Sequence, residues 1–207
     1  EGTPGVLDSL TLRTSERPQP EASEVCIEVR AAGLNFMDVL SALGALPSHP
    51  NGIGPLGTEC AGVIVAVGED ITDYAVGDEV LALVYGSFVR YICTDARNIT
   101  FKPSEMSFEE AATIPLAFLT AYYSLSHIGR LRPGERILIH TASGGVGLAA
   151  VQIAQSIGAE IYATAGNPQK RQFLHDLGIE HVYDSRTLDF AAEIMAQTEN
   201  AGVDLVL

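Results

Sequence analysis

The chain has 207 residues, of which 47% are hydrophobic and 18% are charged. This apolar content suffices for one large domain or two small ones, at roughly 100–200 residues per domain, and it excludes a disordered chain. Twelve Lys and Arg residues against 26 Asp and Glu residues give a net charge of −14, which repels phosphate backbones. No apolar run approaches the ~20 residues of a membrane span. We therefore expect neither nucleic acid nor a membrane as a partner.

The ends of the chain and its cysteines bear on its origin. The chain begins with Glu1 rather than Met and stops inside the apolar run 203–207, so we expect a piece of a longer protein. Cys26, Cys60 and Cys93 are odd in number and lack a partner at metal-ligand spacing, which is typical of reduced thiols. Because no signal-peptide pattern opens the chain, we predict a cytoplasmic protein.

The first half of the chain alternates short β-type runs with turns that contain Gly, Asp and Glu. The β-type runs span residues 25–31, 60–67, 79–84 and 88–94. One helix is expected at residues 35–43, and a second follows Ser107, whose spacing to Glu110 forms a capping box. We predict a β-rich domain over residues 1–115.

Beyond residue 115 the pattern changes to alternating strands and helices. Pro115 begins a helix to about residue 126, and a turn follows. Strand patterns then lie at residues 137–140, 159–163, 181–183 and 203–207, and helix patterns at 146–157, 168–177 and 190–197. Such alternation is typical of a parallel sheet covered by helices. We predict an α/β chain whose second domain, residues 116–207, is a Rossmann-type fold with its first four strands.

A glycine-rich turn between the first strand and helix of that domain predicts a dinucleotide site. Against the fingerprint G-x-G-x-x-G, Ala142 stands at the first position and Gly144 and Gly147 at the second and third. The helix N-terminus then faces the phosphates with partial positive charge. The expected contacts are Ser143, Gly144, Gly145, Val146 and Gly147. The alternative is a purely structural tight turn.

The end of the second predicted strand favours NADPH over NADH. NAD sites place an acid about 20 residues beyond the motif, where it holds the ribose 2′-hydroxyl. Residues 161–175 contain no acid, and Lys170 and Arg171 follow the strand instead. Uncharged space with two cations suits a 2′-phosphate, and we include Thr164 and Gly166 at the strand end in this site. The alternative is that both cations form a solvated helix face.

A β-rich half followed by a nucleotide-binding half resembles the medium-chain dehydrogenase/reductase superfamily. The resemblance implies a GroES-like first domain. Alcohol dehydrogenases of this superfamily hold a catalytic zinc through a Cys and a His at places that correspond here to residues 35–38 and 57–59. Neither residue type occurs there, and no four-cysteine zinc lobe exists. We therefore predict the zinc-free branch and no metal.

Several further segments, spread over nearly the whole chain, occur in the same order as the motifs of a known protein family. They are residues 33–40 (GLNFMDVL), 59–63 (ECAGV), 118–123 (FLTAYY), 139–147 (IHTASGGVG), Lys170 with Arg171, and 202–207 (GVDLVL). Jointly they resemble the enoyl reductase domain of highly reducing polyketide synthases and animal-type fatty acid synthases. The resemblance implies NADPH-dependent reduction of a trans-2-enoyl thioester carried by an acyl carrier protein, with hydride added at Cβ and a proton at Cα.

The resemblance also implies roles for individual residues. It puts Thr120 near the nicotinamide amide and Asn35 at the active-site cleft, while Lys170 resembles the proton donor proposed in relatives. The usual Asp partner of that lysine is replaced by Thr187, so Lys170 as a 2′-phosphate ligand stays open beside Lys170 as an acid. Structural alternatives are a bond from Thr120 to its own helix and Asn35 as a helix N-cap.

Two other functions are compatible with the same residues. One is a free-standing, zinc-independent NADPH:quinone or enone oxidoreductase, and the other is a non-catalytic reductase-like module of a megasynthase. In the favoured interpretation the partners are the carrier-bound enoyl thioester and the other domains of a multidomain synthase, and the parent protein allows a homodimer. Since the second domain holds four of the usual six strands, we expect these 207 residues to be inactive alone.

Overall fold

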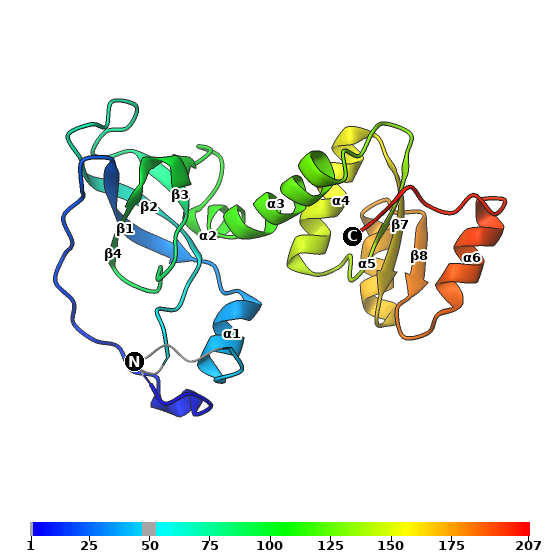
Figure 1. Ribbon diagram of the computed structural model, residues 1–207, viewed down its shortest axis with the longest axis horizontal. Helices are drawn as coiled ribbons and strands as arrows, with labels where there is room; N and C mark the ends of the chain where they lie inside the picture. The colour runs from blue at the N-terminus through cyan, green and yellow to red at the C-terminus, as the bar shows by residue number, and fades with distance from the viewer. Residues whose placement is uncertain (1, 47–52) are drawn as a thin grey trace. The chain divides into compact units, whose positions relative to one another are not determined.

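A computed structural model describes residues 2–46 and 53–207. The chain divides into two compact units, Glu1–Leu116 and Ala117–Leu207. Each unit contains its own sheet (Figure 1), antiparallel in the first and parallel in the second. This arrangement confirms the predicted fold class, an α/β chain with a β-rich half followed by a Rossmann-type half. The unit boundary lies beside the predicted one at residues 115 and 116.

The first unit is built on a five-stranded antiparallel sheet of order β4-β1-β2-β3-β5. Its strands are β1 (Glu24–Ala32), β2 (Glu59–Val67), β3 (Glu79–Leu83), β4 (Tyr91–Asp95) and β5 (Ile99–Phe101). Alternate residues of β1 and β2, among them Val25, Ile27 and Ile64, form the buried core of this sheet, as the period of two requires.

Two details of the first sheet differ from the prediction. The strand expected at residues 88–94 begins only at Tyr91, because Phe88 donates its N–H to the Leu56 carbonyl and Gly86 donates to Gly57 in a loop. The three-residue strand β5 was not predicted, since so short a run carries no readable alternation.

The first unit also contains four short helices among its described residues. They are the 3-10 turns η1 (Leu7–Ser9) and η2 (Ala96–Asn98) and the α-helices α1 (Phe36–Ala42) and α2 (Phe108–Ala111). The capping box before α2 is confirmed: Glu110 N donates to Ser107 Oγ at 3.1 Å, and Ser107 N donates to the Glu110 carboxylate at 2.9 Å. The next helix, α3 (Pro115–Tyr122), begins at the predicted proline.

The second unit holds a four-stranded parallel sheet of order β8-β7-β6-β9. Its elements are β6 (Arg136–Ile139), α4 (Gly145–Ile157), β7 (Glu160–Ala165), α5 (Pro168–Asp176), β8 (His181–Asp184), α6 (Asp189–Gln197) and β9 (Leu205–Val206). On one side of β6 lies β7, followed by β8, and on the other side β9 pairs with β6. The strand order thus reverses at β6, and ligands of such sheets bind at the carboxyl ends beside that point.

Both faces of the parallel sheet are covered. Ile137 and Ile139 of β6 face a core shared with α4 and α5, while Leu138 between them faces a second core shared with α6. Gly158, with φ of 84°, ends α4 in the left-handed conformation that its position predicted. The helix expected to run to residue 126 is present, but beyond Tyr122 it continues as a π-helix, η3 (Tyr123–Ile128).

The cysteines lie in or beside the first sheet as free thiols. Cys26 on β1 stands opposite Cys93 on β4, and Cys60 is buried on β2. Burial raises the pKa of Cys60 and of Cys93 to about 12, so both remain protonated and unreactive near neutral pH. Across the described part of the chain, no helix combines the length and the apolar character that crossing a bilayer demands.

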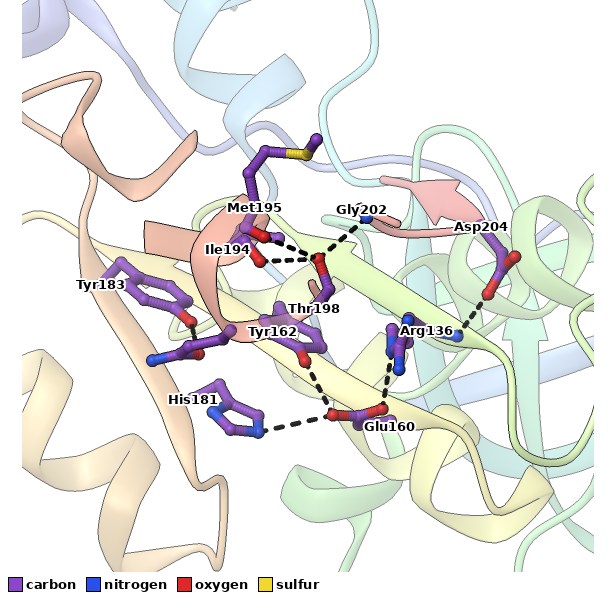
Figure 2. A network of polar contacts seen from close by, with 11 residues as sticks. Arg136, Glu160, Tyr162, His181, Tyr183, Ile194, Met195, Thr198, Gly202 and Asp204 are labelled. Carbon is purple, nitrogen blue, oxygen red and sulfur yellow. Dashed lines mark hydrogen bonds and ion pairs between the residues drawn. The ribbon is translucent and has the colours of Figure 1, made fainter. Parts of the chain in front are cut away.

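A polar network closes the amino-terminal edge of the parallel sheet (Figure 2). The Glu160 carboxylate accepts hydrogen bonds from Tyr162 Oη at 2.7 Å and Arg136 Nε at 3.0 Å, and His181 Nε2 lies 3.5 Å away. Arg136 N donates to Asp204 Oδ2 at 2.8 Å, which fastens the start of β9 to β6. The network therefore ties all four strands together at the edge opposite their carboxyl ends.

We expect the substitution Tyr162→Phe to make the free energy of unfolding less sensitive to low pH. The Tyr162 hydrogen bond is the largest cause of the lowered pKa of Glu160, and Arg136 adds to it. A carboxyl group with a lowered folded pKa stabilises the fold above its unfolded pKa of about 4.3, and this stabilisation is lost as pH falls through the folded value. Urea unfolding of the wild type should thus show a steeper loss below about pH 5 than unfolding of the variant. Tyr183→Phe, which removes a hydrogen bond to Gln197 instead, is the control. Equal slopes for wild type and Tyr162→Phe would contradict the assignment.

Candidate functional site

The glycine turn joins the carboxyl end of β6 to the first residue of α4. Thr141 in this turn has φ of 52°, a genuine outlier for a β-branched residue. Gly144 N donates to the Thr141 carbonyl at 2.8 Å, and Ala142 N donates to the Thr164 carbonyl of β7 at 3.0 Å. Strained backbone held by surrounding hydrogen bonds is characteristic of ligand-binding turns.

The glycines of the turn meet different requirements. A Cβ at Gly147 would lie 2.4 Å from the Thr141 carbonyl oxygen and 2.7 Å from Ala142 Cα, so only glycine allows α4 to pack against the turn. A Cβ at Gly145 would meet nothing within 4 Å, so this residue faces open space. Gly144 is the N-cap of α4 and supplies no side-chain cap, which leaves first-turn N–H groups available to an anion.

Ser143 supplies an independent sign of a ligand. Its Oγ is buried and has no hydrogen-bond partner among the described residues. Buried hydroxyl groups are nearly always satisfied, and an unsatisfied one calls for a missing partner. Together with the open Gly145 and the uncapped helix, this hydroxyl fits the pyrophosphate of a dinucleotide.

Thr164, which was expected to contact the cofactor at the end of β7, is buried instead. Thr164 has no exposed surface, and its Oγ1 lies 3.0 Å from His140 Nδ1. Since its carbonyl also holds Ala142, Thr164 lies beneath the glycine turn and supports it. The structure thus assigns Thr164 a supporting position rather than a place on the surface that a cofactor meets.

The two predicted cations have unequal surroundings. Lys170 is exposed in the first turn of α5, where its backbone N donates to the N-cap Asn167 Oδ1 at 2.8 Å. The Arg171 guanidinium turns back to the sheet, donating to the Ala165 carbonyl at 3.2 Å and lying 3.1 Å from Asp184 Oδ2. Only Lys170 of the pair therefore keeps its charge unengaged within the described chain.

Asn35, in the first unit, is the N-cap residue before α1. Its side-chain Nδ2 donates to Thr58 Oγ1 at 2.9 Å and to Glu59 Oε1 at 2.7 Å, and its backbone N donates to Asp38 Oδ2 at 2.9 Å. Both amide hydrogens of the side chain are thus committed to protein acceptors. The contacts favour a positioning role over direct stabilisation of an oxyanion.

Glu59 is a residue that sequence reasoning did not select. It is only 3% exposed, and its second oxygen, Oε2, accepts a hydrogen bond from Leu116 N at 2.7 Å. One carboxylate therefore joins Asn35 to the first turn of α3. Thr58 and Glu59 form part of the segment where a zinc triplet was sought, yet their partners are the amide groups of Asn35 and Leu116.

Thr120 is exposed on α3, and its hydroxyl makes no hydrogen bond within the described residues. The alternative in which Thr120 only caps a carbonyl of its own helix is therefore not what the structure has. Thr120 belongs to the second unit and Asn35 to the first, so each half of the candidate site is described on its own. Within residues 2–46 and 53–207, no three His, Cys, Asp or Glu side chains gather as a metal site would require.

Two family matches accord with these two units. The alcohol dehydrogenase GroES-like domain matches residues 21–113, and the zinc-binding dehydrogenase family matches residues 145–207. The chain belongs to the medium-chain dehydrogenase/reductase superfamily, as its GroES-like and Rossmann-type halves predicted. Both matched families are described as dehydrogenases, and an NAD-dependent alcohol dehydrogenase is among the similar solved structures, at 30% identity.

Within the superfamily, the chain is similar to enzymes of polyketide synthesis. The CurK enoyl reductase structure superposes with a TM-score of 0.93 and 52% identity, covering 99% of this chain and 64% of that one. A phenolphthiocerol/phthiocerol polyketide synthase protein of Mycobacterium tuberculosis is 47% identical over 204 residues, which cover 99% of this chain and 9% of the relative. The predicted resemblance to polyketide enoyl reductases is thereby confirmed.

A quinone oxidoreductase is a more distant match. The enzyme of Pseudomonas syringae pv. Tomato DC3000 superposes with a TM-score of 0.88 and 32% identity, covering 99% of this chain and 63% of that one. The chain thus spans less than two thirds of both solved enzymes and a small part of the mycobacterial synthase. Identity is higher to the enoyl reductase than to the quinone reductase.

Proposed function

We propose that this chain is part of an NADPH-dependent enoyl reductase that saturates a trans-2-enoyl thioester on an acyl carrier protein during polyketide synthesis. The observation that carries the reaction class is the close similarity to the CurK enoyl reductase over almost the whole chain. The cofactor choice is supported by the end of β7, which lacks an acid and has Lys170 exposed beside it.

The residues of the second unit would hold the cofactor, which when bound supplies a hydride to the β-carbon of the substrate. Ser143 Oγ and the N–H groups at the start of α4 suit the pyrophosphate, and Thr120 offers an exposed hydroxyl to the nicotinamide amide. In the first unit, Glu59 fixes Asn35 and the start of α3. Catalysis of this kind depends largely on holding the cofactor and the enoyl thioester in the correct relative orientation, and fixed side chains serve that purpose.

A single substitution, Lys170→Met, distinguishes the two candidate roles of Lys170, a ligand of the 2′-phosphate and a general acid. If Lys170 holds the 2′-phosphate, we expect the Kd for NADPH to rise about tenfold or more, while the Kd for NADH and the turnover with saturating NADH stay unchanged. A general acid would instead lower turnover with both cofactors by about 100-fold. Steady-state kinetics with both cofactors decides, and Gln169→Met, which alters the neighbouring exposed position, is the control.

The proposed reaction is tested on the full-length protein that contains this chain. Oxidation of NADPH is followed spectroscopically with a trans-2-butenoyl pantetheine thioester and, separately, with a simple quinone. Faster turnover of the thioester supports the proposal, whereas faster turnover of the quinone points to the second candidate, a quinone oxidoreductase, which the Pseudomonas match favours. Absence of NADPH binding would contradict both enzymatic candidates and would favour the third candidate, a non-catalytic reductase-like module.

The proposed partners follow from the same relatives. Because the mycobacterial relative belongs to a polyketide synthase, we propose that this chain works beside other synthase domains, in the cytoplasm, with a homodimer as the parent assembly. Carrier proteins are commonly acidic, and the chain carries a net charge of −14. Delivery of the substrate would then depend on tethering and high effective concentration rather than on charge attraction.

A further inference from the structure

Three arginines gather around the strand pair β1 and β4, where β4 forms one edge of the antiparallel sheet (Figure 1). Arg17 Cζ lies 4.9 Å from the centroid of the Tyr91 ring, and Arg90 Cζ lies 5.2 Å from the same centroid. Glu28 stands opposite Tyr91 in the ladder between the two strands. Its carboxylate lies 3.3 Å from Arg90 Nη2 and 3.0 Å from Arg30 Nη2. We call the three arginines, with the ring and the carboxylate between them, the arginine patch.

The arginine patch concentrates positive charge on an acidic unit. Residues 1–116 contain six Lys and Arg residues against 17 Asp and Glu residues, and three of the six cations lie in the patch. Because the contacts include a single carboxylate, that of Glu28, two positive charges remain uncompensated within the patch. Further along the two strands, Asp95 is paired with Arg97, and Glu24 stands opposite Asp95, four residues from Glu28.

The guanidinium groups are accessible and are held in place. The side chains of Arg30 and Arg90 are 50% and 75% exposed, and Arg17 is exposed as well. Arg17 Nη2 donates to the Val65 carbonyl at 3.1 Å, and the other two arginines donate to Glu28 through Nη2. A guanidinium has five N–H donors, so these contacts leave further donors for a partner. Side chains that are already ordered lose less conformational entropy on binding.

The position of Glu28 distinguishes between a phosphate group and protein carboxylates as the ligand. A phosphate bound between Arg30 and Arg90 would lie beside the Glu28 carboxylate, which repels it. Carboxylates that are spread over a protein surface can instead meet the outer donors of each arginine separately. Arg and Tyr are also residue types that are enriched at protein interfaces. The patch therefore fits an acidic protein surface.

We propose that the arginine patch docks the acidic surface of the acyl carrier protein that delivers the enoyl thioester. The inference rests on the proposed function, because it assumes a carrier-bound substrate. Arg30 precedes Asn35 by five residues, which span at most roughly 18 Å, so a carrier docked here lies near the predicted active-site cleft. Tethering brings the carrier close despite the net charge of −14, and the patch then selects the face of the carrier that makes contact.

The test compares two substrates of the full-length protein. One is the trans-2-butenoyl thioester on the carrier domain of the same synthase, followed in a single turnover, and the other is the free trans-2-butenoyl pantetheine thioester. We expect the double variant Arg30→Gln/Arg90→Gln to reduce the carrier-bound substrate about three- to tenfold more slowly than the wild type and to reduce the free thioester at an unchanged rate. At 1 M salt, where the Debye length is ~3 Å, this difference should largely disappear. Arg30→Lys/Arg90→Lys, which keeps both charges, should retain most of the rate.

The control and the second substrate separate this inference from the function on which it rests. Arg97→Gln is the matched control, because its side chain is 88% exposed beside the far end of β4 and lies outside the patch. Equal rates for the wild type and the double variant, equal losses with both substrates, or the same loss in Arg97→Gln would overturn the inference and leave the proposed function standing. Failure of the wild type to reduce the free thioester would contradict the proposed function and the inference with it. Loss confined to the carrier-bound substrate supports both.

Discussion

Gly147→Val is expected to abolish dinucleotide binding. The added Cβ would lie 2.4 Å from the Thr141 carbonyl oxygen and 2.7 Å from Ala142 Cα, and both are backbone atoms that cannot swing away. The start of α4 must therefore move away from the turn, which carries Ser143 and the free N–H groups. Displacement by about 1 Å can cost ~100-fold in function, and overpacking costs about 1–3 kcal/mol of stability. Titration with NADPH and urea unfolding measure the two effects.

The control for Gly147→Val lies at the other end of the same helix. Gly158 has φ of 84° and nothing within 4 Å of its would-be Cβ, so Gly158→Ala introduces backbone strain of about 1–2 kcal/mol without touching the turn. We expect this variant to lose stability to a similar extent and to bind NADPH as the wild type does. If Gly147→Val bound the cofactor normally, the turn would not be the pyrophosphate site.

The parts of this site that the sequence predicts are those that depend on neighbours in the chain. The strand, glycine turn and helix at residues 136–157 were all expected, because the spacing of the glycines and the change of hydrophobic period lie within one short segment. The capping box of Ser107 and the left-handed Gly158 were predicted for the same reason.

Contacts between distant segments could not be predicted in this way. Glu59 reaches Leu116 across 57 positions, and Arg186 reaches Gly166 from the neighbouring strand, so nothing local in the sequence signals either contact. Thr164 was included in the cofactor site from its place in the sequence, yet it is fully buried and its hydroxyl contacts His140. The π-helix after Tyr122 depends on i→i+5 bonds such as Gly129 N to Ser124 O, which apolar periodicity does not distinguish from an α-helix.

These distant contacts also change which residues are expected to act directly. Arg171 was selected for its charge and Asn35 through the family resemblance. In the structure, Nη1 of Arg171 is directed to the Ala165 carbonyl and Asp184, and the amide hydrogens of Asn35 are directed to Thr58 and Glu59. Within the described residues, Lys170 remains without an ion pair at the edge where the fold binds ligands. A polar residue at a site is thus better judged by the donors it has left than by its type.

Glu59→Gln is expected to destabilise the first unit by about 2–3 kcal/mol, because a buried donor is left without an acceptor. Both carboxylate oxygens accept hydrogen bonds at 2.7 Å, one from Asn35 Nδ2 and one from Leu116 N. Glutamine has the same shape but a single oxygen, so its NH2 group must face one of these donors. Since Glu59 is almost fully buried, water cannot take the place of the lost acceptor.

Urea unfolding of Glu59→Gln and of Glu69→Gln, which changes an exposed turn residue, measures this effect directly. Asn35→Ala then distinguishes the two contacts of Glu59 through a double-mutant cycle. If Asn35 is held mainly by Glu59, the destabilisation of the double variant should fall at least ~0.5 kcal/mol short of the sum of the single ones. Additive effects, or a loss in Glu59→Gln no larger than in the Glu69 control, would mean that the carboxylate does not position Asn35. The position of the Asn35 amide would then depend on its contact with Thr58 instead.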